Sequence, residues 1–149
     1  MFDLHECDDV NRFARGIAQC VLFLADEDVV EPAAGEFDAP FDECDETFIG
    51  DCYHIATTFL DAESLEALQQ LDRTRVMRPG SDIIEDAGNF LVYHTSGSGM
   101  RWDENDDWAE NEALRHLRGR AESHFAALEH RIHLFRNDDG MIEFDMPFR

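Results

Sequence analysis

No lysine or arginine occurs between Arg15 and Arg73, although these 57 positions hold fifteen aspartates and glutamates. The whole chain has 34 acidic residues against 12 basic ones, all of them arginine, so its formal net charge is -22. Like charges at this density repel one another and destabilise any compact state. The fold must therefore bury enough apolar surface to offset the repulsion while keeping the carboxylates in water.

The composition can supply such a core. Hydrophobic residues make up 44% of the 149 residues and include twelve phenylalanines, which is too apolar for a disordered chain. A chain of this length is within the usual size of one domain, so we expect a single compact domain over residues 1–149.

The charge and the start of the chain restrict partners and location. A pI near 4.3 argues against direct binding to nucleic acid or to an anionic membrane, since both require a cationic protein surface. The opening MFDLHECDD is acidic where a secretory signal needs positive charge. No apolar stretch approaches the roughly 18 residues of a membrane span. We therefore expect a cytoplasmic protein with thiol cysteines rather than disulfides.

Apolar residues that recur every three or four positions predict three helices. Asp8 or Asp9 is expected to cap the first helix, and Pro32 follows its end. Asp61 is expected to cap the second helix, with Leu60 and Leu65 placed as a hydrophobic staple. The expected spans are residues 9 to about 28–30, 62 to about 75, and 105–106 to about 129.

Two hairpins are expected late in the chain. The first pairs residues 90–94 with 100–102 through a loop rich in serine and glycine. The second pairs residues 132–135 with 141–146, because Asn137-Asp138-Asp139-Gly140 is a strong turn signal.

Residues 31–51 contain prolines and glycines with little periodicity, which predicts mostly loop and leaves room for a short strand at 47–49. Together, about three helices and about four strands predict an α+β fold with a small antiparallel sheet formed from the late hairpins.

The acidic tract is the candidate partner-binding surface, with eleven acids in 26 residues. A folded chain of this mass exposes about 7,800 Å², so its acids average roughly one per 230 Å². Duplex DNA presents roughly one charge per 100 Å². A face that concentrates the tract could reach that density. The candidate residues are Asp26, Glu27, Asp28, Glu31, Glu36, Asp38, Asp42, Glu43, Asp45, Glu46 and Asp51.

We therefore expect a binding protein that imitates nucleic acid and inhibits a basic nucleic-acid-binding protein or complex. In size and charge the chain resembles the small acidic inhibitors by which phages and plasmids disarm restriction or CRISPR complexes. That resemblance implies an anti-defence role. We expect no catalytic residue, cofactor or metal. A homodimer remains open at this stage.

Three alternatives compete with this hypothesis. The first is a solvated acidic surface without a partner, as in adaptation to salt or for solubility. The second is a small enzyme in which His94 activates a nucleophile in the loop Thr95, Ser96 and Ser98. The third is a metal site, either calcium among the loop acids or zinc at a group of cysteines and histidines. The zinc candidates are Cys44, Cys52 and His54, with His5 and Cys7 as further ligands.

Overall fold

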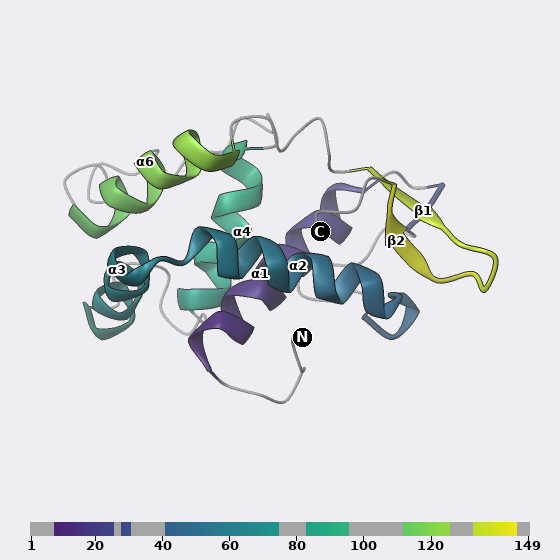
Figure 1. The fold of residues 1–149 in the computed structure, drawn as a ribbon, viewed down its shortest axis with the longest axis horizontal. Helices are drawn as coiled ribbons and strands as arrows, with labels where there is room; N and C mark the ends of the chain where they lie inside the picture. Colours follow the sequence, from purple (N-terminus) through teal and green to yellow (C-terminus); the bar gives the residue numbers. More distant parts are fainter. Residues whose placement is uncertain are drawn as a thin grey trace.

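The computed structural model describes residues 8–25, 28–30, 41–74, 83–95, 112–125 and 133–145. In these residues the chain forms five α-helices, one short 3-10 helix and a two-stranded antiparallel sheet (Figure 1). The predicted α+β class is therefore confirmed, with helices dominating. The elements are α1 (Asp9–Leu24), η1 (Phe41–Glu43), α2 (Glu46–Phe59), α3 (Ala62–Thr74), α4 (Ile83–Thr95), α6 (Glu112–Phe125), β1 (Leu134–Arg136) and β2 (Ile142–Phe144).

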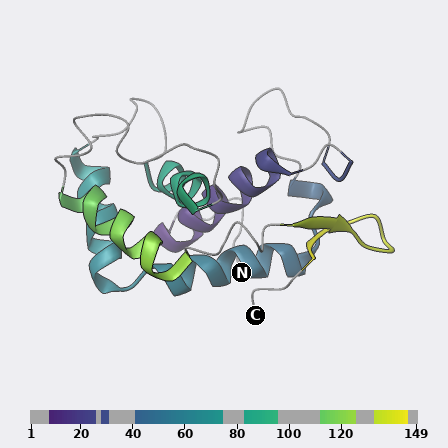
Figure 2. The same cartoon turned by 90° about the horizontal axis from the view of Figure 1, so that it is seen from above.

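The helix α1 lies at the centre of the arrangement. It packs against α4 and α2, while α3 packs against α6 and β2 packs against α2. Both views of the ribbon place α3 and α6 at one end of the molecule and the β1–β2 hairpin at the other (Figures 1 and 2). The long helix α2 spans the distance between these ends, so it connects the helical end to the hairpin.

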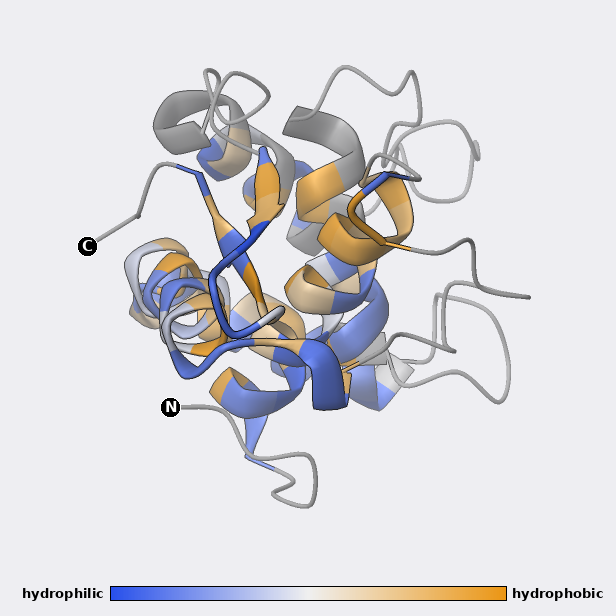
Figure 3. Cartoon of the chain, turned by 90° about the vertical axis from the view of Figure 1, so that its right-hand side faces the viewer, coloured by the Kyte–Doolittle hydropathy of each residue, from blue (hydrophilic) through white to orange (hydrophobic). Residues whose placement is uncertain are grey.

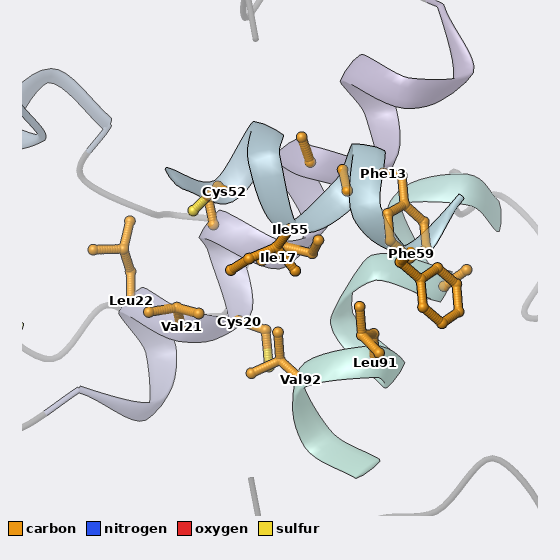
Figure 4. Packing of buried hydrophobic residues seen from close by; sticks show 14 of the residues in the cluster. Phe13, Ile17, Cys20, Val21, Leu22, Cys52, Ile55, Phe59, Leu91 and Val92 are labelled. Atoms are coloured by element: carbon orange, nitrogen blue, oxygen red, sulfur yellow. The ribbon is translucent and has the colours of Figure 1, made fainter. Parts of the chain in front are cut away.

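The buried core lies where α1, α2 and α4 meet. Figure 4 shows side chains from these three helices directed toward a shared interior. The rings of Phe13 and Phe59 stack with centroids 5.2 Å apart, and those of Phe48 and Phe144 stack at 4.9 Å. The second pair joins α2 to the hairpin, so the sheet is anchored by the same core as the helices.

Several local predictions are confirmed. The side chain of Asp8 caps α1 by accepting a hydrogen bond from the backbone N–H of Asn11 at 3.0 Å. The helix ends at Leu24, a few residues before the predicted end. The helix α3 matches the predicted span of 62–75, and the second predicted hairpin is β1–β2 with its turn at 137–140.

Two predictions are wrong. Residues 90–94 belong to α4 and not to a strand, and residues 47–49 belong to α2. The first stretch is rich in aromatic and branched residues, which favour strands, but Ile84, Ala87 and Leu91 form a buried helical line that decides the outcome. The partner strand at 100–102, the loop at 96–99 and the predicted start of the third helix at 105–106 lie outside the described residues.

The helices α1 and α4 touch backbone to backbone. Both Gly16 and Gly88 are buried at this contact. A Cβ built on Gly16 would overlap the carbonyl oxygen of Glu85, and one built on Gly88 would overlap that of Phe13 and lie 2.9 Å from the amide nitrogen of Ile17. Since the obstructing atoms are main chain, neither helix can accept a methyl group without moving.

We expect Gly16→Ala and Gly88→Ala each to lower the free energy of unfolding by about 1–3 kcal/mol, the usual cost of overpacking. The measurement is urea unfolding followed by circular dichroism. Gly119→Ala is the matched control, because nothing lies within 4 Å of a Cβ at that helical position. It should raise stability by about 0.5–1 kcal/mol through helix propensity. Equal losses at all three positions would contradict the close contact.

Candidate acidic interface

The start of α2 and the hairpin are joined by backbone pairing. Cys44 forms a parallel bridge with Ile142, and the N–H of Asp45 donates to the carbonyl oxygen of Ile142 at 3.0 Å. The strand β2 thus lies between β1 and the segment that leads into α2. This pairing fixes the position of the hairpin relative to the acidic residues of η1 and α2.

Two carboxylates share neutral hydrogen-bond donors at this junction. Asp45 caps α2, because its Oδ1 accepts from the N–H of Thr47 at 3.0 Å. The hydroxyl oxygen of Thr47 lies 2.9 Å from this Oδ1 and 2.7 Å from Oε1 of Glu143. The side-chain amide of Asn137 donates to Asp45 Oδ2 at 3.0 Å and to Glu143 Oε2 at 2.8 Å. These donors hold two acids close together without a cation.

The same hydrogen bonds keep Asp45 charged. The backbone N–H of Thr47, followed by its hydroxyl, lowers the pKa of the Asp45 carboxyl below its ordinary value, and the Asn137 amide adds to the effect. At neutral pH the site therefore presents a carboxylate at this position, even though it lies beside other acids.

Among the described residues one arginine lies within this group of acids, and each of its three guanidinium nitrogens donates a hydrogen bond. Arg136 donates from Nη2 to Oε1 of Glu43 at 2.9 Å, from Nε to the carbonyl oxygen of Val29 at 2.9 Å and from Nη1 to that of Gly140 at 2.7 Å. It ties η1, residues 28–30 and the hairpin turn together. Its charge offsets Glu43 and leaves the neighbouring acids unbalanced.

We call the surface formed by η1, the start of α2, residues 28–30 and the β1–β2 hairpin the acidic end. It faces the viewer in Figure 3, where the hydrophilic turn of the hairpin lies in front. Five of its acids are exposed and form no ion pair within the described part of the chain. These five are Asp28, Asp42, Glu46, Asp138 and Asp139. Glu43, Asp45 and Glu143 complete the acidic end.

The arginines of the helical bundle, in contrast, neutralise acids there. Arg15 contacts Glu85 at 3.0 Å, with both side chains only 14% exposed. Arg120 lies 3.3 Å from Asp61, and Arg12 bridges Asp9 and Asp72. Among the described residues, the uncompensated charge therefore gathers at the hairpin, although α3 also exposes Glu63 and Glu66.

The structure tests where the eleven candidate acids lie. Asp28, Asp42, Glu43 and Glu46 are exposed at the acidic end, and Asp45 is half-buried as a helix cap. The placement of Asp51 on a binding surface is wrong, because it is only 2% exposed. It follows Phe48 by one helical turn and therefore shares its inward face. The remaining candidates lie outside the described residues: Asp26, Glu27, Glu31, Glu36 and Asp38.

Sequence reasoning missed the contribution of the hairpin. Asp138, Asp139 and Glu143 lie beside η1 and the start of α2, about 95 residues away along the chain. The turn signal at 137–140 located two of these acids on a hairpin, but no local pattern shows where a hairpin docks. Only the long-range pairing of β2 with Cys44 brings the two acidic segments together.

Of the proposed zinc ligands, Cys44 and Cys52 lie close enough to interact electrostatically, but His54 is directed away from them. Cys52 is fully buried, whereas His54, two positions later on α2, is exposed. Residues two apart on a helix point in nearly opposite directions. Within the described ranges no group of three histidine, cysteine or acidic side chains is arranged to hold a metal ion. The further ligands His5 and Cys7 lie outside those ranges.

The proposed catalytic loop is not built as expected. His94 and Thr95 end the helix α4 and not a strand, and Ser96 and Ser98 lie outside the described residues. A different serine, Ser64, has its Oγ 3.4 Å from Nε2 of His116. The backbone N–H of Ser64 donates to Oδ1 of Asp61 at 2.8 Å, so Asp61 caps α3. The Ser64 side chain is fully buried, so its hydroxyl is not accessible as a nucleophile.

No protein-family model, curated protein or solved structure matches the chain. None of the helices in the described ranges is long and apolar enough to cross a membrane.

The lowered pKa of Asp45 predicts a pH-dependent contribution to stability. A carboxyl whose folded pKa is depressed stabilises the fold above its unfolded pKa, near 3.8, and loses that contribution as pH falls through the folded value. We expect Asp45→Asn to destabilise the protein at pH 7 and to differ less from the wild type near pH 2. Urea unfolding at both pH values measures this. Asp138→Asn, which removes an exposed charge but no helix cap, is measured alongside as the charge-matched comparison.

The buried thiols give a second prediction. Burial, followed by the carboxylates of Glu43 and Asp42, raises the pKa of the Cys44 thiol from 9.0 to about 12. At pH 8 its thiolate fraction should fall about a thousandfold relative to the unfolded chain. In a Cys7→Ser background, iodoacetamide labelling read by peptide mass spectrometry should therefore modify Cys44 only after urea unfolding. Rapid labelling of the folded protein would show that Cys44 is accessible and ionised.

Proposed function

We propose that this protein is a binding protein whose acidic end occupies the cationic groove of a nucleic-acid-binding protein and so excludes the nucleic acid. The observation that carries the proposal is the set of five exposed carboxylates on one end of the fold that form no ion pair among the described residues. They surround a junction where hydrogen bonds hold two further carboxylates in place. The proposal places the protein in the cytoplasm, where such a partner would meet its nucleic acid.

The chemistry of the acidic end supports this kind of partner. Arginine binds carboxylates and phosphates with the same bidentate geometry, so a groove built for phosphates also accepts an ordered set of carboxylates. The acids at the end of the hairpin and on η1 belong to segments joined by Arg136 and by the bridge at Cys44. A fixed array loses less conformational entropy on binding than acids on separate flexible segments would.

Inhibition by imitation also explains the uneven use of arginine. The bundle places its arginines beside acids, which lowers repulsion within the core layers. At the acidic end, Arg136 is the only described arginine that pairs with an acid. A solvated acidic surface without a partner gives no reason for concentrating the unbalanced charge in this way.

The test compares two triple variants with the same change in charge. The first, Asp42→Asn with Asp138→Asn and Asp139→Asn, neutralises the acidic end. The second neutralises exposed acids of α3 and α6 and serves as the control. It combines Glu63→Gln, Glu66→Gln and Glu112→Gln.

Each variant is immobilised and used to capture proteins from a lysate, with elution by duplex DNA, by RNA or by rising salt. We expect the wild type to capture nucleic-acid-binding proteins that nucleic acid displaces. The first variant should lose about tenfold in affinity and show a flatter salt dependence, because rim charges contribute up to about 1 kcal/mol each. The control should stay within about twofold. Equal losses in both variants, or no capture by the wild type, would contradict the proposal.

A further inference from the structure

The strand β1 leaves one edge open. Its only partner in the described part of the chain is β2, which is itself paired on its far side with Cys44. The N–H of Asn137 donates to the carbonyl of Met141, and the N–H of Asp145 donates to that of His133. Hydrogen-bonded pairs alternate in an antiparallel ladder, so the main-chain groups of Leu134 and Arg136 point away from β2. The open edge thus offers two N–H donors and two carbonyl acceptors.

The side chains divide between the two faces of the hairpin. Leu134 and Arg136 lie opposite Phe144 and Ile142, which are buried, so this face meets the core. Phe135 lies opposite Glu143 on the other face and is 39% exposed. An exposed aromatic ring beside a free strand edge is a combination that monomeric proteins usually avoid, by placing lysine, proline or a bulge there. The segment Leu134–Arg136 contains no lysine or proline and its pairing register is regular, so its edge is protected only by its three-residue length and the charge of Arg136.

The negative charge around the open edge of β1 favours a basic segment as its binding partner. The turn that follows β1 carries Asp138 and Asp139, both of which are exposed and form no ion pair with any described residue. The guanidinium of Arg136 is already used by Glu43 and two carbonyl groups, so it contributes no free cation. A second copy of this chain would bring another charge of -22 to the same place. A basic segment would instead be attracted to it.

We infer that the open edge of β1 accepts an extended basic segment of the partner protein as an added strand. Main-chain hydrogen bonds to Leu134 and Arg136 would hold the segment, Phe135 would pack against one of its apolar side chains, and the turn acids would meet its arginines or lysines. This inference rests on the proposed function and specifies how the partner is bound.

The test uses the full chain labelled with ¹⁵N and a synthetic peptide of alternating arginine and valine. The control peptide has the same charge, but proline replaces alternate valines, so it cannot complete a strand ladder. Solvent exchange of individual amide protons is measured by NMR, with and without each peptide. The first peptide should slow exchange at the amides of Leu134 and Arg136 at least about tenfold, because these amides gain acceptors. Phe135 and Asn137, whose amides face β2, should change little.

A variant separates the apolar contact from the charge. Phe135→Thr keeps a strand-forming residue and the net charge, so it should weaken binding of the alternating peptide several-fold without altering the salt dependence. Unchanged affinity in this variant would overturn the role of Phe135. Unfolding curves of the variant and the wild type show whether the hairpin is intact.

The outcomes distinguish this inference from the proposed function. If the alternating and the proline peptides bind equally, and exchange at Leu134 and Arg136 is unchanged, strand addition is overturned while charge-driven binding stands. If the exchange rate of these amides falls as the protein concentration rises, without any peptide, the edge binds a second copy of the chain. The inference is then again overturned. If neutralising Asp42, Asp138 and Asp139 affects neither peptide binding nor lysate capture, the proposed function itself fails.

Discussion

The contact between α1 and α4 at Gly16 and Gly88 is the constraint on which the rest of the structure depends. Because no side chain separates the two backbones, the helices approach closely enough for Arg15 to reach Glu85 at 3.0 Å and for Gln19 to donate to the same carboxylate at 2.7 Å. The same approach leaves the opposite side of α1 free to pack on α2. The position of α2 then determines where the hairpin docks. The two glycines between α1 and α4 therefore influence the arrangement of charges at the acidic end.

The second constraint is electrostatic. With 34 acids and 12 arginines, most carboxylates cannot be paired, and the fold decides where the imbalance remains. Arginines on α1 and α6 contact acids of neighbouring helices, where repulsion would oppose close packing. The acidic end relies instead on neutral donors from Thr47 and Asn137. Such donors fix carboxylates in position without cancelling their charge, which is a useful property for a surface that has to attract cations.

The sequence predicted features that depend on local chemistry and missed those that depend on distant contacts. The cap at Asp8, the helix α3 and the turn at 137–140 follow from residues within a few positions of each other, and all three are confirmed. The segment 90–94 has a composition that favours a strand, but packing of α4 against α1 decides in favour of a helix. The sequence does not show that Asp51 is buried, because Gly50 interrupts the helical pattern of Phe48, Cys52 and Ile55. The docking of the hairpin beside η1 has no local signal at all.

The hydrogen bond between Thr47 and Glu143 spans 96 positions of sequence. A contact of such separation adds stability only after the entropic cost of closing a long loop has been overcome. During synthesis the first half of the acidic end leaves the ribosome long before its second half exists. The complete surface can therefore form only after the hairpin has been synthesised and has docked beside η1 and the start of α2.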